Sequence, residues 1–420
     1  MKTKFQNGAE QVVGGIGFED GSCIDLVLDG SLRLALWDGQ LTSIAEKFSI
    51  RGKSYVPGEL DSMASAIYFP RRVCLDENLE KLRADVQIEL GRLAFLDRNY
   101  VALLTGLIFT SWFADAFVAA PSVVLVRGGA DEVNHCFRLL NCLCRRPLLV
   151  AHCDGRTFNN LPLRYQPTLL ISHVVGEDVV AALQSTSQGP AKYFHRGELF
   201  DAPIMKVMPS SVLESCGNMT ASIPIVLQPI RADKFPAQNY YDNLREEFQA
   251  RLLGHRLKNL HAVRKAAWIS DRTSGPMGPV LDALTICTPN ISANVQSIFC
   301  AQEKELALER EAQPDYVVCE AALVFCHDKA RTQAMVSEIG NSANSISAQR
   351  GSPLNLTARA AGHQLKRLGI RVVRLGADGR GINFDGYTRK KIHKIASQLE
   401  VPSTRERQAG CPHCVADMAS

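Results

Sequence analysis

The feature that most constrains the fold is an apolar strand that runs into a glycine turn and then into a helix. The strand is the β-branched run at 121–126, the turn is Gly128-Gly129, and apolar residues then recur every three to four positions over 131–144. Further apolar runs lie at 168–171 and 223–227, with helical and hairpin-like segments between them. Strands that alternate with helices predict an α/β domain with a parallel sheet.

This strand, turn and helix stand where a nucleotide-binding P-loop would be, but the residues of a P-loop are missing. A P-loop carries G-x-x-x-x-G-K-[S/T], whose backbone amides wrap the phosphates while the lysine neutralises charge and the hydroxyl holds Mg²⁺. Here Gly128 and Gly129 begin the motif, but Val133 replaces the second glycine, Asn134 the lysine and His135 the hydroxyl. We therefore interpret these positions as a vestigial nucleotide site and expect no cofactor.

The end of the second apolar run lacks the acidic residues of an ATPase in the same way. Such carboxylates hold Mg²⁺ in active enzymes, whereas Ser172 and His173 follow the run at 168–171 here. Because both strands are expected in one sheet, His135 and His173 could approach each other across neighbouring strand ends. Two motifs lost together indicate a core without hydrolytic activity, and we assign no catalytic residue.

The segment from about 102 to 263 resembles AAA+-like P-loop ATPases of bacterial mobile elements and phages. The matching stretches are 110–115 (TSWFAD), 121–126 (PSVVLV), 137–140 (FRLL), 221–226 (ASIPIV) and 251–257 (RLLGHRL). The resemblance implies a P-loop parallel-sheet core with degenerate Walker A and Walker B motifs. It also implies that such domains associate through their sides, so that self-association or a protein partner is expected by analogy.

The formal net charge of +4 conceals an uneven distribution of charge. Residues 350–407 contain 13 Lys and Arg against 4 acidic residues, which gives +9, and the remainder has 34 against 39, which gives −5. Clustered positive charge is the electrostatic footprint of a nucleic-acid-binding protein. The sequence therefore predicts DNA as a partner of the C-terminal part.

The basic segment has the order of elements that is typical of a winged helix-turn-helix. The expected elements are helices at 334–346 and 358–368, strands at 370–375 and 382–384, and a closing helix at 387–399. Thr357 is the expected N-cap of the second helix and Gly369 its C-terminal stop. The segment resembles the C-terminal winged modules that follow mobile-element ATPase cores.

In a winged helix-turn-helix the second helix enters the major groove and the hairpin lies along the backbone. Basic residues on that helix, on the hairpin and on the closing helix are therefore the candidate DNA contacts. They are Arg359, His363, Lys366, Arg367, Arg371, Arg374, Arg380, Lys390, Lys391 and Lys394. Leu365 and Leu368 are expected to pack inward.

The 13 cysteines follow no disulfide spacing, and 1–11 lacks the apolar segment of a signal peptide. We expect reduced thiols in a cytoplasmic protein. The run Cys411-Pro412-His413-Cys414 has the form of half a zinc site, but a structural zinc needs four ligands and no second Cys/His pair stands at a suitable spacing. The run Cys326-His327-Asp328 holds triad residue types, yet adjacent residues rarely face one another. No metal is expected.

The rest of the chain sets the expected domain organisation. The domains are an N-terminal accessory element with Asp-Gly hairpin turns (1–75), the degenerate ATPase-like core (76–270), a helical linker or lid (271–330), the winged-helix-like basic domain (331–407) and a tail (408–420). The apolar stretch 101–126 contains Asp115 and Pro121, which favours a buried helix and strand over a membrane span.

With 46% hydrophobic and 21% charged residues, the composition is that of a globular protein and excludes a disordered or fibrous chain. The best interpretation is a cytoplasmic DNA-binding or scaffolding protein, from a mobile element or phage-related system, with an inactive pseudo-ATPase core. Two alternatives stay open: a divergent ATP-dependent motor or helicase-type ATPase, and a protein-interaction module that does not bind DNA.

Overall fold

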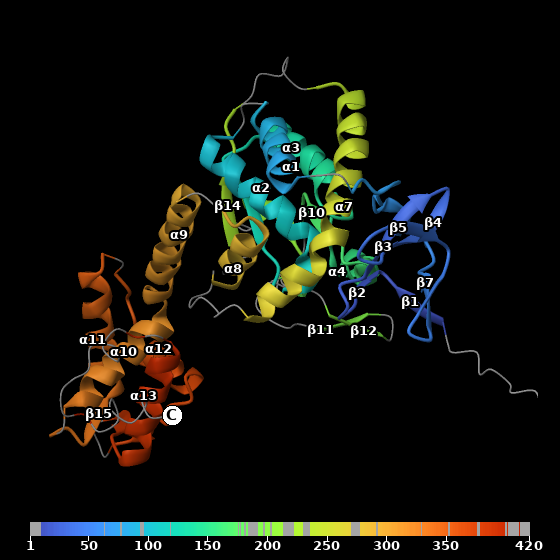
Figure 1. The fold of residues 1–420 in the computed structure, drawn as a ribbon. Coiled ribbons are helices and arrows are strands. Elements are labelled where there is room, and N and C mark those ends of the chain that lie inside the picture. Colours follow the sequence, from blue (N-terminus) through green and yellow to red (C-terminus); the bar gives the residue numbers. More distant parts are fainter. Residues whose placement is uncertain are drawn as a thin grey trace, which may run out of the picture. The chain divides into compact units, whose positions relative to one another are not determined.

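The structure is a computed structural model of the 420-residue chain, and it divides into two compact units, Met1–Glu303 and Lys304–Ser420 (Figure 1). The residues that it describes are 10–62, 64–75, 78–92, 96–117, 119–174, 176, 178–179, 182–183, 192–195, 198–201, 204–212, 222–229, 236–269, 278–290, 293–328, 330–351, 353–375, 379–399, 401 and 411. The finer division into five domains stays a prediction.

The first unit contains a five-stranded parallel sheet, which confirms the predicted α/β class. Its strands are β8 (Ser122–Val126), β9 (Pro147–Val150), β10 (Thr168–Ile171), β13 (Lys206–Pro209) and β14 (Ser222–Val226). Their order in the sheet is β14-β8-β13-β10-β9, and every neighbouring pair is parallel. The three apolar runs that the sequence singled out correspond to β8, β10 and β14.

The sequence did not reveal β9 or β13. The presence of β13 corrects the expectation that the strands at 121–126 and 168–171 are neighbours in the sheet. Because β13 lies between β8 and β10, the strand ends that carry Gly128 and Ser172 are two strand spacings apart, about 10 Å. The β13 sequence is weakly strand-like, since it begins with Lys206 and ends with Pro209. Lys206 is fully buried, and that burial lowers its pKa to about 7.

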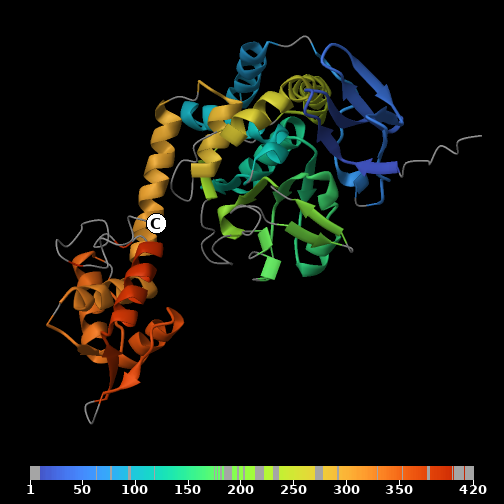
Figure 2. The same cartoon turned by 60° about the horizontal axis from the view of Figure 1, so that its bottom comes forward.

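The helices that pack against this sheet or against one another are α1 (Leu79–Gly91), α2 (Arg98–Trp112), α3 (Ala130–Leu143), α7 (Gln238–Ile269) and α8 (Gly278–Cys287) (Figure 2). The short helix α4 (Gly155–Asn160) and 3₁₀ turns at η1 (Ala64–Ala66), η2 (Ala114–Ala116) and η3 (Leu163–Tyr165) also belong to the first unit, whereas α9 (Ala293–Glu311) spans the boundary between the two units. The apolar stretch 101–126 is a buried helix, α2, followed by the buried strand β8, as predicted. Among the described residues, no helix is both long and apolar enough to cross a membrane.

The N-terminal strands form two further sheets. They are β1 (Glu10–Val13), β2 (Gly15–Gly17), β3 (Cys23–Asp29), β4 (Ser31–Trp37), β5 (Thr42–Ala45), β6 (Phe48–Ile50) and β7 (Lys53–Pro57). The order β2-β3-β4-β5 is antiparallel throughout, as the Asp-Gly turns predicted. In the second sheet, β1-β7-β6, β1 instead runs parallel to β7. A separate hairpin joins β11 (Lys192–His195) to β12 (Glu198–Asp201).

The N-terminal strands share a hydrophobic core with the parallel sheet. Ile24 and Leu34 belong to the same buried cluster as Leu169 and Ile171 of β10. Leu170 is equally buried but lies outside that cluster, because successive side chains of a strand point to opposite faces of its sheet. One face of the sheet is therefore covered by the N-terminal strands, and α3 contacts β9 and β10 as well.

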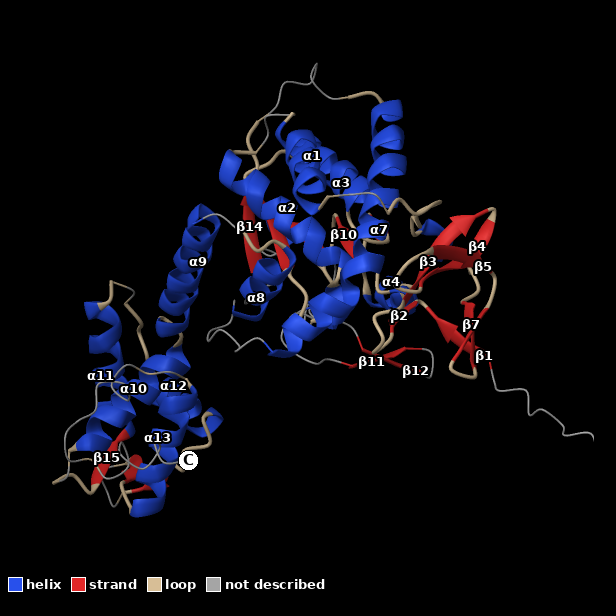
Figure 3. Cartoon of the chain, in the orientation of Figure 1, coloured by secondary structure: helices blue, strands red, loops and turns tan. Residues whose placement is uncertain are grey.

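The second unit is built mainly from helices, with one small antiparallel sheet (Figure 3). Its elements are α10 (Pro314–His327), β15 (Gln333–Met335), α11 (Val336–Gln349), α12 (Ala358–Arg367), β16 (Val373–Arg374), β17 (Arg380–Asn383) and α13 (Gly386–Gln398), with sheet order β15-β17-β16. The predicted helices, hairpin and closing helix are all present, whereas β15 was not predicted. Ile339, Leu365, Ile382 and Ile392 join these elements in one core.

Candidate nucleic-acid interface

Helix α12 begins and ends where the sequence predicted. The Thr357 hydroxyl accepts a hydrogen bond from the Ala360 amide at 3.2 Å, which satisfies one of the free amides at the helix start. Gly369 follows the helix with φ +73°, and its amide donates to the Lys366 carbonyl at 2.8 Å. Only glycine adopts this backbone conformation readily, so the chain leaves the helix at a fixed point.

Helix α12 buries its apolar side and exposes its basic side. Ala361 and Leu365 are fully buried, and Leu368 packs partly buried against the same core. Arg359, His363, Lys366 and Arg367 are all exposed. Packing therefore fixes the rotation of the helix, and the face left to solvent is the one predicted to contact DNA.

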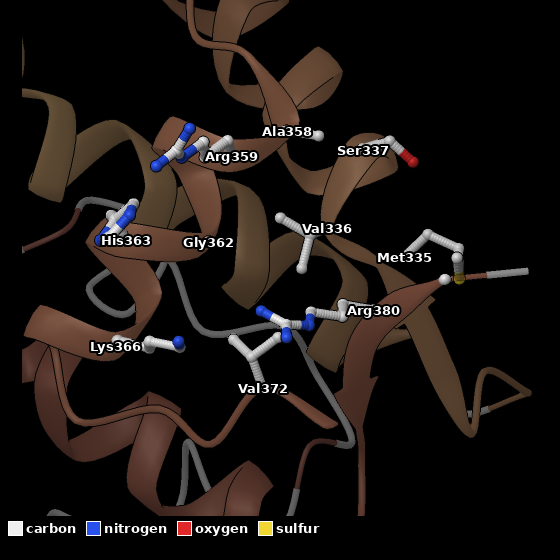
Figure 4. Close-up of a pocket in the computed structure, with 11 residues that line it drawn as sticks. Met335, Val336, Ser337, Ala358, Arg359, Gly362, His363, Lys366, Val372 and Arg380 are labelled. Carbon is white, nitrogen blue, oxygen red and sulfur yellow. The ribbon is translucent and has the colours of Figure 1, made fainter. Parts of the chain in front are cut away.

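A groove of about 570 Å³ lies between α12 and the β16–β17 hairpin (Figure 4). Its lining residues are Met335, Val336, Ser337, Ala358, Arg359, Gly362, His363, Lys366, Val372, Gly379 and Arg380. Arg359, His363 and Lys366 come from α12, and Arg380 reaches towards that helix from the hairpin. Four predicted DNA-contact residues thus lie on one concave surface. One wall of this groove is formed by β15 and the start of α11. This wall was not predicted, because β15 is a three-residue strand without a sequence signal.

The hairpin places two like charges opposite each other. Arg374 of β16 pairs directly with Arg380 of β17, and both side chains are exposed. Like charges directly opposite each other across antiparallel strands destabilise the sheet. Neither arginine forms an ion pair with any acidic residue that the structure describes. The pair costs folding free energy unless an anion neutralises it.

Of the other predicted DNA-contact residues, Arg367 and Lys391 already contact groups within the second unit, whereas the rest face solvent. Arg367 donates to the Asp315 carboxylate, with 3.0 Å from Nε to Oδ2. The Lys391 ammonium lies against Gly369, where a cation stabilises the C-terminal end of α12. Outside the groove, the other positions, Arg371, Lys390 and Lys394, are exposed, and the structure describes no acidic ion-pair partner for them.

Of the positions predicted as a vestigial nucleotide site, Gly128 and Gly129 form the turn between β8 and α3 in the first unit. Helix α3 begins at Ala130, so Asn134 and His135 lie within the helix rather than in a loop. Asn134 is exposed, while His135 is buried and hydrogen-bonds through Nδ1 to the Tyr241 hydroxyl. Burial lowers the pKa of His135 to about 4, so its ring is neutral at pH 7.

The glycine turn before α3 is closely covered by two side chains. A Cβ on Gly128 would lie 2.6 Å from Leu227 Cδ1, and a Cβ on Gly129 would lie 2.8 Å from Glu132 Oε2. Glu132 is a buried acid in the first turn of α3, where a negative charge favours the helix N-terminus. A protein carboxylate therefore stands where a phosphate would be expected.

The predicted residues after β10 have local partners. The Ser172 amide donates to the Val150 carbonyl at 2.9 Å, and the His173 carbonyl accepts from the Cys153 amide at 2.8 Å. The His173 ring stacks on His152, with ring centroids 5.5 Å apart. The sequence left an approach of His135 and His173 open but favoured histidines with other partners, and each ring indeed contacts another residue, Tyr241 and His152 respectively.

No protein-family model matches the chain, and no curated protein matches it. Among solved structures, it is similar to the apo C-terminal region of NrS-1, with TM-score 0.36 and 9% identity, over 86% of this chain and 96% of that one. It is also similar to Drosophila ORC bound to DNA, with TM-score 0.19 and 12% identity, over 79% and 97%. A third similarity is to Cdc6p from Pyrobaculum aerophilum, with TM-score 0.19 and 12% identity, over 80% and 98%. All three TM-scores are below 0.5.

Proposed function

We propose that the chain binds duplex DNA through its second unit, which acts as a winged helix-turn-helix. Helix α12 would enter the major groove, and the β16–β17 hairpin would lie along the phosphate backbone. The observation that carries this proposal is the Arg374–Arg380 pair, because two arginines opposite each other, with no ion-pair partner among the described residues, favour an anionic ligand. Phosphates spaced along a duplex supply such a ligand.

The distribution of the other cations supports the same surface. Arg359, His363 and Lys366 face the groove, while Arg367 and Lys391 are already engaged within the unit. Phosphate contacts set the position of a protein on DNA, and contacts to base edges set its specificity. On this basis the hairpin arginines and Lys366, near the C-terminal end of α12, would contact the backbone, and Arg359 and His363 would reach the bases.

We infer that the first unit is a P-loop-like core that does not hydrolyse nucleotide and serves as a scaffold. The turn that would hold phosphates is three residues long and is covered by Leu227 and the Glu132 carboxylate. We expect no ATP hydrolysis above background, either with or without duplex DNA. DNA-stimulated turnover above the rate of a Gly128→Val variant would instead favour the ATP-dependent motor.

Fluorescence anisotropy of a labelled duplex at several salt concentrations tests the DNA proposal. Six to ten phosphate contacts would lower the affinity by about 10³–10⁵-fold between 50 and 200 mM salt. Replacing Arg374 and Arg380 by Gln should reduce the slope of log K against log salt by about two, since each phosphate contact contributes about 0.9.

The matched control is Arg350→Gln. Arg350 belongs to the same basic segment, but its Nη1 is 2.8 Å from the Glu320 carboxylate. Its loss changes the net charge without removing a free cation, and we expect the salt slope to be unchanged. If the hairpin double variant binds DNA with the wild-type slope and affinity, the DNA-binding surface lies elsewhere or the unit binds protein instead.

A further inference from the structure

Three metal-ligating side chains meet in the second unit, away from the groove. His327 is the last residue of α10, His393 lies in the middle of α13, and Cys411 comes from the C-terminal segment. One ligand atom from each residue lies within 4.8 Å of the other two. His327 and His393 approach through their Nε2 atoms, and Cys411 approaches His393 Nε2 through Sγ. His393 and Cys411 are buried, with 2% and 8% of their surface exposed.

The distances fit a single tetrahedral ion. The Nε2 atoms of His327 and His393 are 3.1 Å apart, and Cys411 Sγ is 3.3 Å from His393 Nε2. With Zn–N of about 2.05 Å and Zn–S of about 2.3 Å, tetrahedral angles separate two nitrogens by about 3.3 Å and a nitrogen from a sulfur by about 3.6 Å. These two distances are therefore within a few tenths of an ångström of the tetrahedral values, and the third pair, His327 and Cys411, lies within 4.8 Å.

The surroundings of His393 fix the ring in the state that a metal ligand needs. His393 Nδ1 is 2.8 Å from the Arg389 carbonyl, which can only accept, so Nδ1 carries the proton and Nε2 presents its lone pair. A metal-ligating histidine usually donates its second ring N–H to a carbonyl or carboxylate in this way. Cys326 Sγ also lies near this nitrogen, 3.7 Å from Nδ1.

Hydrogen bonds alone explain poorly why two groups meet at His393 Nε2. One lone pair faces both the His327 ring nitrogen and the Cys411 sulfur, and it can accept only one good hydrogen bond. A cation accepts a lone pair from each of the three groups at once. Two imidazoles and a thiolate are a donor set typical of zinc.

We propose that His327, His393 and Cys411 supply three of the four ligands of a zinc ion that fixes Cys411 to α10 and α13. The sequence motif that holds Cys411 has the spacing of half a zinc site, and the fold supplies the second half from two helices. The other residues of that motif, 412–414, lie outside the described residues. The sites for zinc and for DNA are separate, so that either proposal can fail without the other.

Metal analysis of the full chain, purified without a polyhistidine tag under reducing conditions, tests the proposal. We expect about one zinc ion per chain by mass spectrometry. His327→Ala and Cys411→Ser should lose most of this zinc. Cys300→Ser and His261→Ala are matched controls at exposed positions, and both should retain it.

Cobalt substitution gives a readout that does not depend on whether a variant folds. The wild-type chain loaded with Co²⁺ should show the visible bands of tetrahedral cobalt and a near-ultraviolet thiolate-to-cobalt band. The proposal is overturned if wild-type chain reconstituted with zinc holds less than about a tenth of an equivalent, or if the thiolate band is absent. Equal zinc in Cys411→Ser and wild type would overturn it too.

Discussion

The buried carboxylate of Asp25 is expected to hold the N-terminal strands to the parallel-sheet core. Asp25 lies in β3 and is 1% exposed. It accepts from Arg145 at 3.1 Å and also from Arg146 and Arg256, all of them buried. Arg256 belongs to α7, so this one side chain joins three parts of the first unit.

The magnitude follows from the charges that would remain. The cluster contains three arginines, Arg145, Arg146 and Arg256, and two aspartates, Asp25 and Asp115. All five side chains are more than nine-tenths buried, and their net charge is +1. Asp25→Asn raises this to +2 without water to screen it. Removing one partner of a buried ion pair costs about 3–5 kcal/mol, and we expect a loss of this size in the free energy of unfolding.

Urea unfolding followed by circular dichroism measures this loss. Asp29→Asn is the matched control, because Asp29 lies in the same strand but is exposed. Its one ion pair among the described residues, with Arg33 at 3.4 Å, is exposed to solvent. It should cost no more than about 1 kcal/mol. If Asp25→Asn costs as little as the control, the buried ion pairs of Asp25 do not stabilise the fold.

The same cluster predicts the response to acid. The arginines hold the pKa of Asp25 and the pKa of Asp115 far below their usual values, against the opposing effect of burial. A carboxyl whose pKa is lowered by folding stabilises the protein above its unfolded pKa of about 3.9, and this contribution is lost as the pH falls below that value. Asp25→Asn should therefore have a smaller loss of stability than wild type between about pH 4 and pH 2.

Three further predictions concern single positions and the metal. Lys366→Gln should reduce the salt slope of DNA binding by about one, whereas Arg367→Gln on the same helix should change it less, because Arg367 is already ion-paired. Equal slopes for the two variants would contradict this. Gly254→Ala should destabilise the first unit by at least about 1–3 kcal/mol, since its Cβ would lie 1.7 Å from the Cys74 carbonyl oxygen. Gly91→Ala, with open space around it, is the control in the same urea assay, and a similar loss in both would refute the clash. A zinc chelator should lower the melting temperature of the wild-type chain but not of a zinc-free variant, as measured by calorimetry.

The elements with strong local signals were predictable from sequence. The strands β8, β10 and β14 are continuous apolar runs, and α12 has a threonine cap and a glycine stop. β13 was not predictable, because Lys206 within it is buried by neighbours that are remote in sequence. Burial of a polar side chain is decided by tertiary packing, and a local pattern does not record it.

The candidate sites show the same limit. The basic residues of α12 could be found because they share one helix, and their clustering appears in the charge count. The Arg374–Arg380 pair required the register of the hairpin, which the turn residues alone did not fix. His327, His393 and Cys411 are separated by 66 and 18 residues, so their meeting depends on how α10 packs on α13. A motif search by spacing therefore finds only the Cys411 half of the proposed zinc site.

The β8–α3 turn allows a last test of the proposed inactive core, which separates the effect of residue identity from that of backbone geometry. The variant Glu132→Gln, Val133→Gly, Asn134→Lys restores the second glycine and the lysine and removes the competing charge. In the structure, however, the Val133 amide already donates to the Gly129 carbonyl at 3.1 Å as part of α3. A P-loop needs such amides to point at phosphates.

We therefore expect this triple variant not to bind a fluorescent ATP analogue with Mg²⁺, although its lysine would stand at an exposed position. Asn134→Lys alone is the control, and it should leave the urea midpoint unchanged because the Asn134 side chain makes no described hydrogen bond in the helix. Micromolar affinity of the triple variant for ATP would show that the helix start can unwind. In that case the identity of these residues, and not the early start of α3 at Ala130, would underlie the proposed inactivity of the core.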